Sequence, residues 1–196
     1  MFIDYVTLLL INMVAGLAVL ATFVAKDLYR EKEKRWAPAL GAVGLVAMTG
    51  GFYMVFTWPL PGPYNMIFGE MSIMFGAAFL TAGIAVGLGR DIMPVAIYGA
   101  IAGLASILLG ARIINLGLTQ APVLSGIGFI LTGAGGVLLF VLSCMKHCPK
   151  LRIALVVVLA GAALIWAWTG YMAYWGHAES FQGWKPRVFQ QRKTEG

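Results

Sequence analysis

Charged side chains are scarce in this sequence. Only 11% of its 196 residues are charged and 60% are apolar, whereas soluble domains are about one quarter charged and about half apolar. No polar stretch between the apolar runs is long enough to form a soluble domain. This composition excludes a soluble globular protein and indicates an integral membrane protein.

Histidine, cysteine and the common nucleotide-binding and hydrolytic motifs are also scarce or absent. The sequence has two histidines and two cysteines, and it contains no P-loop, GxGxxG, HExxH or serine-elbow motif. It therefore does not support a nucleotide-dependent or hydrolytic enzyme of a soluble type, and whether the protein is an enzyme stays open. His147 and His177 are expected at opposite membrane surfaces, which disfavours a haem held by two histidines. The cofactor is unknown.

The segment CMKHC, from Cys144 to Cys148, is where potential metal ligands cluster. It offers two thiols and the imidazole of His147, but structural zinc sites use four ligands. We therefore expect no metal site. We interpret both cysteines as reduced thiols on the cytoplasmic side of the membrane.

Six apolar runs are each long enough to cross a hydrocarbon core of about 30 Å, which takes roughly 20 helical residues. We place them at residues 5–25, 37–58, 65–88, 92–111, 123–144 and 153–174. The prediction is an all-α fold, a six-helix transmembrane bundle. Residues 1–175 form its transmembrane domain, and residues 176–196 form an aromatic and basic tail outside the cytoplasm. Asp4 stands where a cleavable signal would carry Lys or Arg, so we interpret the first run as a span.

Basic residues predict the orientation, because cytoplasmic loops are enriched in Lys and Arg. One set of alternate loops holds nine Lys and Arg residues, whereas the other holds only Arg112 before the tail adds four more. The nine are Lys26, Arg30, Lys32, Lys34, Arg35, Arg90, Lys146, Lys150 and Arg152. The excess of nine over five predicts both termini outside the cytoplasm. It also explains the net charge of +6 without a nucleic-acid partner.

Glycine spacing predicts close helix packing and a tandem repeat. Small residues let helices approach closely in lipid. Shifting the chain by 57 to 58 residues aligns Gly41 with Gly99 and Gly69 with Gly126. This alignment predicts that the hairpin of spans two and three is repeated as spans four and five, an arrangement typical of transporters. A chance match within apolar sequence is the alternative.

Polar side chains gather near the predicted outer surface. Glu70 lies five residues into the third span, about 7 Å deep at 1.5 Å per residue, and Arg112 directly follows the fourth span at the same surface. A charge at mid-bilayer costs at least about 3 kcal/mol, so we expect Glu70 to face other helices and to pair with Arg112. The predicted ligand-binding residues are Glu70, Arg112, Asn65, Asn115, Asn12, Tyr64, His177 and Glu179.

Several interpretations of this polar region stay open. Glu70 forms a structural bridge with Arg112, binds a solute or ion together with it, or acts as a protonatable group. The leading hypothesis is binding or translocation of a small polar solute or ion. The alternatives are an accessory quinone- or lipid-binding subunit of a membrane redox complex, and a lipid-modifying membrane enzyme. The lipid bilayer is the expected partner, and a homo-oligomer or a larger membrane complex stays open.

A resemblance rests on the stretch PLPGPYNMIFGE at residues 59–70, the basic first loop, the six spans and WGHAE at residues 175–179. Together these features resemble an uncharacterised family of small multi-spanning membrane proteins from archaea and some bacteria, of unknown function. The resemblance covers most of the chain. It implies a prokaryotic cell membrane and carries over no activity and no catalytic residue.

Overall fold

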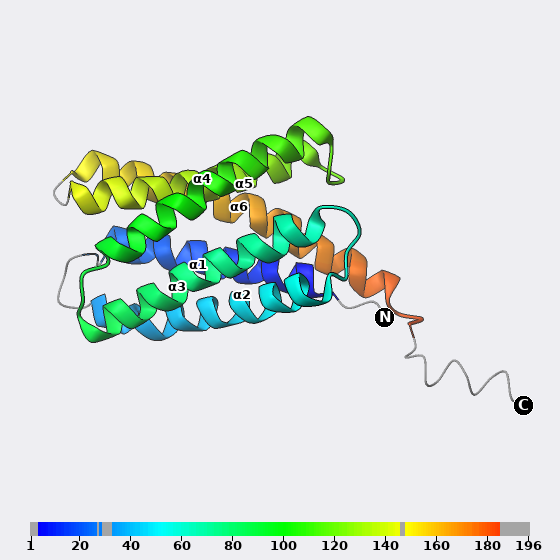
Figure 1. The fold of residues 1–196 in the computed structure, drawn as a ribbon, viewed down its shortest axis with the longest axis horizontal. Helices are drawn as coiled ribbons and strands as arrows, with labels where there is room; N and C mark the ends of the chain where they lie inside the picture. Colours follow the sequence, from blue (N-terminus) through cyan, green and yellow to red (C-terminus); the bar gives the residue numbers. More distant parts are fainter. Residues whose placement is uncertain (1–3, 27, 29–32, 146–147, 185–196) are drawn as a thin grey trace, which may run out of the picture.

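The computed structural model describes residues 4–26, 28, 33–145 and 148–184, which form helices and no strand (Figure 1). The long helices are α1 (Tyr5–Lys26), α2 (Ala37–Thr57), α3 (Met71–Leu88), α4 (Met93–Leu116), α5 (Pro122–Cys144) and α6 (Pro149–Ser180). A short 3-10 helix, η1 (Glu33–Trp36), precedes α2, and a π-helical segment, η2 (Asn65–Glu70), precedes α3. Six helical stretches are long and apolar enough to cross a membrane. The prediction of an all-α bundle with six spans is confirmed.

Proline and glycine set most helix boundaries. Proline occupies one of the first two positions of α2, α4, α5 and α6, where helices accept it because the first N–H groups have no partner within the helix. Gly89 and Gly117 end α3 and α4 with φ of 65° and 63°, a conformation that glycine adopts without steric cost. Helices α4 and α6 extend beyond the predicted runs 92–111 and 153–174. Helix α6 therefore continues through the predicted boundary after residue 175.

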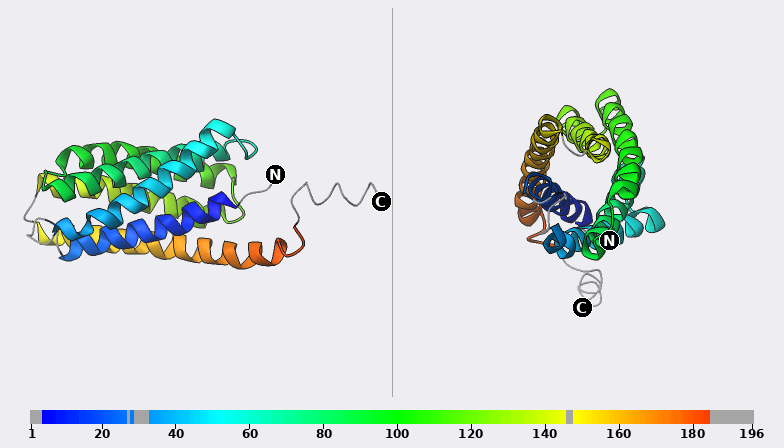
Figure 2. Two further views of the ribbon diagram at one scale, coloured as in Figure 1. Left: turned by 90° about the horizontal axis from the view of Figure 1, so that it is seen from below. Right: turned by 90° about the vertical axis from the view of Figure 1, so that its left-hand side faces the viewer.

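The six helices form a ring in chain order. Each helix packs against the next, and α6 closes the ring against α1, as the right-hand view of Figure 2 shows. Successive helices run in opposite directions, so the first and last described residues lie at one end, together with loops 58–64 and 117–121. We call this the terminal end. The other three connections lie at the opposite end.

Helices α4 and α5 approach so closely that their backbones touch. A methyl group added at Gly110 would lie 2.6 Å from the carbonyl oxygen of Gly126, and one added at Gly126 would lie 2.6 Å from that of Gly110. Gly103 and Gly133 form the same reciprocal contact two turns away. Glycine at these positions lets the Cα–H groups reach the facing carbonyl oxygens, a contact worth about 0.5–1 kcal/mol.

The hairpin of α2 and α3 is held in the same way. A methyl group at Gly44 would lie 2.7 Å from the carbonyl oxygen of Gly76, and the reverse distance is 2.8 Å. A methyl group at Gly51 would lie 2.8 Å from the carbonyl oxygen of Gly69 in η2. The two hairpins thus share one kind of contact. The glycines contributed by η2 and α3 lie 57 residues before those of α5, whereas their partners in α2 lie 59 residues before those of α4, outside the predicted shift of 57 to 58. The duplication itself stays a prediction.

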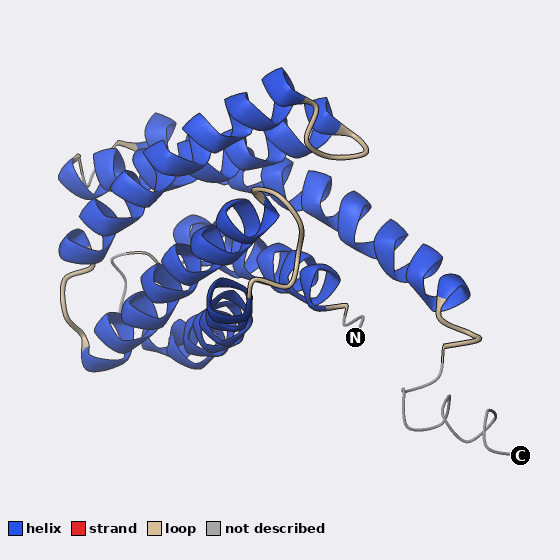
Figure 3. Cartoon of the chain, turned by 45° about the vertical axis from the view of Figure 1, so that its right-hand side comes forward, coloured by secondary structure: helices blue, strands red, loops and turns tan. Residues whose placement is uncertain are grey.

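Helices α1 and α6 complete the ring and supply much of the core. A methyl group added at Gly170 of α6 would lie 2.9 Å from Cδ1 of Ile11 in α1. Leu17 of α1 is buried, as are Leu159 and Trp166 of α6. The 32 residues of α6 span about 48 Å at 1.5 Å per residue. This length exceeds the membrane core, and α6 runs beyond the other helices at the terminal end (Figure 3).

We expect Gly103→Ala to destabilise the bundle by about 1–3 kcal/mol, because overpacking of a tight contact costs about that much. Gly99→Ala is the matched control one turn earlier in α4, where an added methyl group meets nothing within 4 Å. Thermal unfolding of the purified variants in one detergent, followed by circular dichroism, should give a lower midpoint for Gly103→Ala only. Equal midpoints would contradict the backbone contact.

Candidate functional site

Both polar atoms of the Asn65 side-chain amide bond to the loop that precedes η2. Asn65 is fully buried. Its Nδ2 donates to the carbonyl oxygen of Leu60 over 2.5 Å, and its Oδ1 accepts from the N–H group of Leu60 over 3.1 Å. The side chain therefore holds the proline-rich loop 58–64 in shape. A ligand contact by Asn65 stays a prediction.

Tyr64 and Asn12 serve two different junctions of the bundle. The hydroxyl of Tyr64 donates to the carbonyl oxygen of Leu118, which joins the two loops at the terminal end. The Nδ2 of Asn12 in α1 donates to the carbonyl oxygen of Val43 in α2 over 2.9 Å. Both side chains connect neighbouring segments, and their predicted role in ligand binding stays a prediction.

Glu70 and Arg112 lie on the outer surface of the bundle. Both are exposed, and Arg112 follows Leu104 and Leu108 along an exposed stripe of α4. Within the described residues, no ion pair or hydrogen bond joins Glu70 to Arg112. The prediction that Glu70 faces other helices and pairs with Arg112 is therefore wrong.

The shallow depth of both charges explains this difference. Glu70 lies within two turns of the start of η2, and Arg112 lies within two turns of the end of α4. At this depth a long charged side chain can extend to the headgroup region instead of pairing inside the bundle. That Glu70 or Arg112 binds a ligand stays a prediction.

A polar cluster that the sequence interpretation missed joins the start of α1 to the end of α6. Nδ1 of His177 lies 2.9 Å from Oδ2 of Asp4 and 3.2 Å from Oγ1 of Thr7. The hydroxyl of Thr7, which is 1% exposed, donates to Oδ1 of Asp4 over 2.5 Å. Two other predicted residues, Glu179 of α6 and Asn115 of α4, are exposed. The expected placement of Asp4 and His177 at one membrane surface was the signal that could have revealed this cluster.

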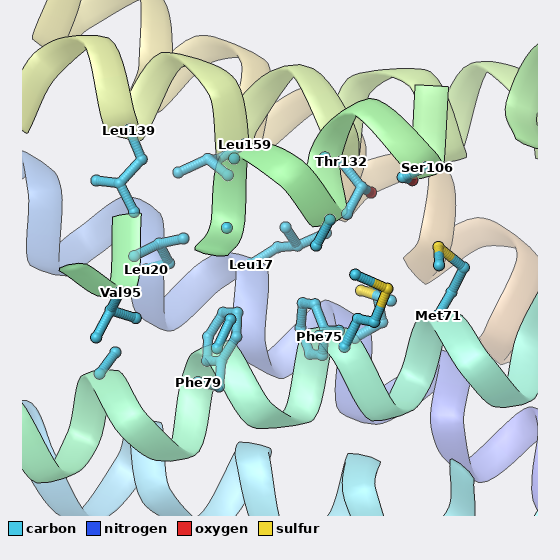
Figure 4. Close-up of a pocket in the computed structure, with 18 of the residues that line it drawn as sticks. Leu17, Leu20, Met71, Phe75, Phe79, Val95, Ser106, Thr132, Leu139 and Leu159 are labelled. Carbon is cyan, nitrogen blue, oxygen red and sulfur yellow. The ribbon is translucent and has the colours of Figure 1, made fainter. Parts of the chain in front are cut away.

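A cavity of about 120 Å³ lies inside the ring, and residues of all six helices line it. Figure 4 shows Phe75 and Phe79 of α3 on one side and Leu139 of α5 and Leu159 of α6 across from them. None of the residues that line it is an Asp, Glu, His, Lys or Arg. The cavity is therefore suited to an apolar molecule or to the apolar part of one.

Polar side-chain atoms enter the cavity only towards the terminal end. Ser106 of α4, Thr132 of α5 and Trp166 of α6 line this part, and Figure 4 shows the first two beyond Phe75, towards Met71. Ser106 Oγ donates to the carbonyl oxygen of Phe129 over 2.8 Å. Trp166 Nε1 donates to Thr132 Oγ1 over 2.9 Å, and Thr132 Oγ1 donates to the carbonyl oxygen of Gly128 over 2.8 Å.

The junction of α3 and α4 is the most open side of the ring. These two helices share the least extensive contact of the six neighbouring pairs. Met74 and Ala78 of α3 and Val95 and Ala102 of α4 line the cavity and are partly exposed. We infer that the cavity opens between these helices towards the surrounding bilayer.

The described residues hold no group of three or more His, Cys, Asp or Glu side chains that could bind a metal ion. Cys144 and Cys148 are free thiols. His147, which lies between them in the sequence, is outside the described residues.

Comparison with known protein families matches residues 1–180 to DUF981, described as a protein of unknown function. The chain belongs to this family. The match confirms the resemblance to an uncharacterised family, and the six apolar helices fit a small multi-spanning membrane protein. No curated protein and no solved structure matches the chain. Family membership assigns neither a ligand nor an activity, so both depend on the site itself.

The contact between Asp4 and His177 should be measurable as a coupling in a double-mutant cycle. We expect Asp4→Asn and His177→Ala together to cost less than the sum of the single changes. The coupling should stay below about 1 kcal/mol, because solvent weakens exposed pairs and the His177 side chain is 39% exposed. Thermal unfolding in detergent measures it, and Glu179→Gln on the same helix is the control. Strict additivity would contradict the contact.

Proposed function

We propose that this protein binds an apolar, lipid-derived molecule inside its ring of helices. The observation that carries the proposal is the apolar cavity to which all six helices contribute. Ligand sites are commonly concave and mostly apolar, with a few placed polar groups. The cavity matches this description, and its polar groups occupy one part of it.

The volume of the cavity supports the proposal that it holds a ligand. An empty cavity of about 120 Å³ costs about 3 kcal/mol at roughly 24 cal/mol per Å³. An engineered cavity of about 150 Å³ in another protein binds benzene. A six-membered ring or a short branched chain is therefore the part of a ligand that this space can enclose. The remainder would leave between α3 and α4, where the surrounding lipid is the expected source of the molecule.

The polar-solute hypothesis has less support from the geometry. Glu70 and Arg112 point outward, and Asn65 and Tyr64 bind the backbone of nearby loops. A solute or ion site needs such groups to converge on one point, as they do in ligand pockets. We therefore propose binding of an apolar molecule rather than passage of a polar one. An accessory role beside a membrane redox partner is compatible with this activity.

We also propose that the terminal end faces away from the cytoplasm. Of the described Lys and Arg residues, six lie at or near the opposite end and only Arg112 lies near the terminal end. The six are Lys26, Lys34, Arg35, Arg90, Lys150 and Arg152. This distribution follows the enrichment of basic residues on the cytoplasmic side.

The orientation can be tested by thiol labelling in intact bacterial cells that produce the protein. A membrane-impermeant maleimide should label Ser180→Cys, which places a thiol at the exposed end of α6. The exposed natural thiol of Cys144 at the opposite end should react only after the cells are opened. The unsubstituted protein is the control for background labelling. The reverse pattern would overturn the proposed orientation.

Ligand binding can be tested by filling the cavity. Gly99 lines it, and a side chain there meets nothing within 4 Å of its Cβ position, so we expect Gly99→Leu to fold. The leucine should weaken binding of 4-fluorotoluene, followed by ¹⁹F NMR of the purified protein, by about tenfold or more, equal to about 1.4 kcal/mol. Leu104→Phe, on the exposed side of the same helix, is the matched control and should bind like the natural protein.

Two outcomes would overturn the proposed function. One is the absence of any bound 4-fluorotoluene signal in the natural protein. The other is equal binding by the natural protein and a folded Gly99→Leu variant, since the probe would then be bound elsewhere. Thermal unfolding of Gly99→Leu and Leu104→Phe establishes that both variants are folded.

A further inference from the structure

The cavity offers hydrogen-bond acceptors and no free side-chain donor. Its lining holds three side chains that carry an N–H or O–H group, namely Ser106, Thr132 and Trp166. Each of these groups already donates to another atom of the protein. The backbone N–H groups of the lining near Ser106 lie within helices, where they donate to carbonyl oxygens of the preceding turn. Val95, in the first turn of α4, lies at the other end of the cavity (Figure 4).

Ser106 provides the clearest acceptor. Ser106 is buried, and its single hydroxyl proton is directed at the carbonyl oxygen of Phe129. A hydroxyl oxygen has two lone pairs, and among the described residues no donor reaches the oxygen of Ser106. Thr132 has less to offer, because its oxygen already accepts from Trp166. The sulfur atoms of Met71 and Met74 are weak acceptors in the same lining.

We propose that the ligand carries a hydroxyl donor, as an alcohol, a phenol or a quinol does, and that this hydroxyl donates to Ser106 Oγ. This inference rests on the proposed function and adds the chemical class of the ligand. The hydroxyl lies in the half of the cavity towards the terminal end. The apolar remainder of the ligand packs against Phe75, Phe79 and Leu139 and extends towards the junction of α3 and α4.

Other polar groups fit this site less well. A carbonyl group, as in a quinone or a ketone, would face the oxygen atoms of Ser106 and Thr132 without a donor, and an unsatisfied buried polar group is costly. A carboxylate, as in a fatty acid, would in addition need a cationic partner, and no Lys, Arg or His lines the cavity. A hydroxyl group can satisfy Ser106 without adding an unpaired acceptor.

The test compares two probes of nearly equal shape that differ in the donor. ¹⁹F NMR measures binding of 4-fluorophenol and 4-fluorotoluene to the purified natural protein, to Ser106→Ala and to Ser125→Ala. Ser125 is a buried serine of α5 outside the cavity, where it accepts a hydrogen bond from Thr119. It is therefore the matched control. Comparing each probe between variants cancels its partition into the detergent.

We expect Ser106→Ala to weaken binding of 4-fluorophenol about fivefold, the typical contribution of one hydrogen bond. Ser125→Ala should leave it unchanged, and 4-fluorotoluene should bind all three proteins equally. Equal binding of 4-fluorophenol to the natural protein and Ser106→Ala would overturn the hydroxyl assignment while the proposed function stands. An equal loss of both probes in Ser106→Ala would also overturn it, because shape would then be the cause. Failure of both probes to bind the natural protein would overturn the proposed function as well.

A second variant tests the same assignment if Ser106→Ala does not fold. Ser106→Cys keeps the shape of the side chain and replaces the oxygen by a weak sulfur acceptor. We expect it to weaken 4-fluorophenol more than 4-fluorotoluene. Equal effects on the two probes would overturn the assignment.

Discussion

Direct backbone contact between paired helices is the constraint on which the rest of this structure depends. In lipid, burying apolar surface adds little to helix association, so close packing must supply the stability. At the pairs Gly103–Gly133 and Gly44–Gly76 the two backbones meet with no room for a side chain. Two hairpins joined in this way form firm walls. With α1 and α6 they leave space along the axis that no side chain fills.

The chemistry of that space follows from the same constraint. Because glycines occupy the interface of the hairpin, larger side chains of α3 such as Phe75 and Phe79 turn inward and line the cavity. On α4, Ile101 and Leu104 turn outward to the lipid. The hydroxyl groups of Ser106 and Thr132 line the cavity. Each donates to a backbone carbonyl oxygen, Ser106 to one of a neighbouring helix and Thr132 to one of its own helix. The cavity therefore has apolar walls, and the hydroxyl oxygens in it are available as acceptors rather than as donors.

The spans could be predicted from one sequence, because their length and polarity are properties of the chain alone. Which side chains point inward and which point towards lipid could not be predicted, since both the interior and the surroundings of a membrane bundle are apolar. That Glu70 and Arg112 lie close to helix ends was thus predictable, but their outward direction was not. Ser106 looks like any other serine of a span until α5 is placed beside it. The contact of His177 with Asp4 depended on α6 continuing past residue 174.

The sparse junction of α3 and α4 has a mechanical consequence. We expect each glycine-paired hairpin to move as one body, because its two backbones are in contact. A displacement of the ring would then change the separation between the two hairpins rather than the packing within each. Shear and hinge motions of this kind occur over microseconds to milliseconds. The ring would then widen between α3 and α4 while every glycine pair stays closed, and the proposed ligand would exchange with the membrane without local unfolding.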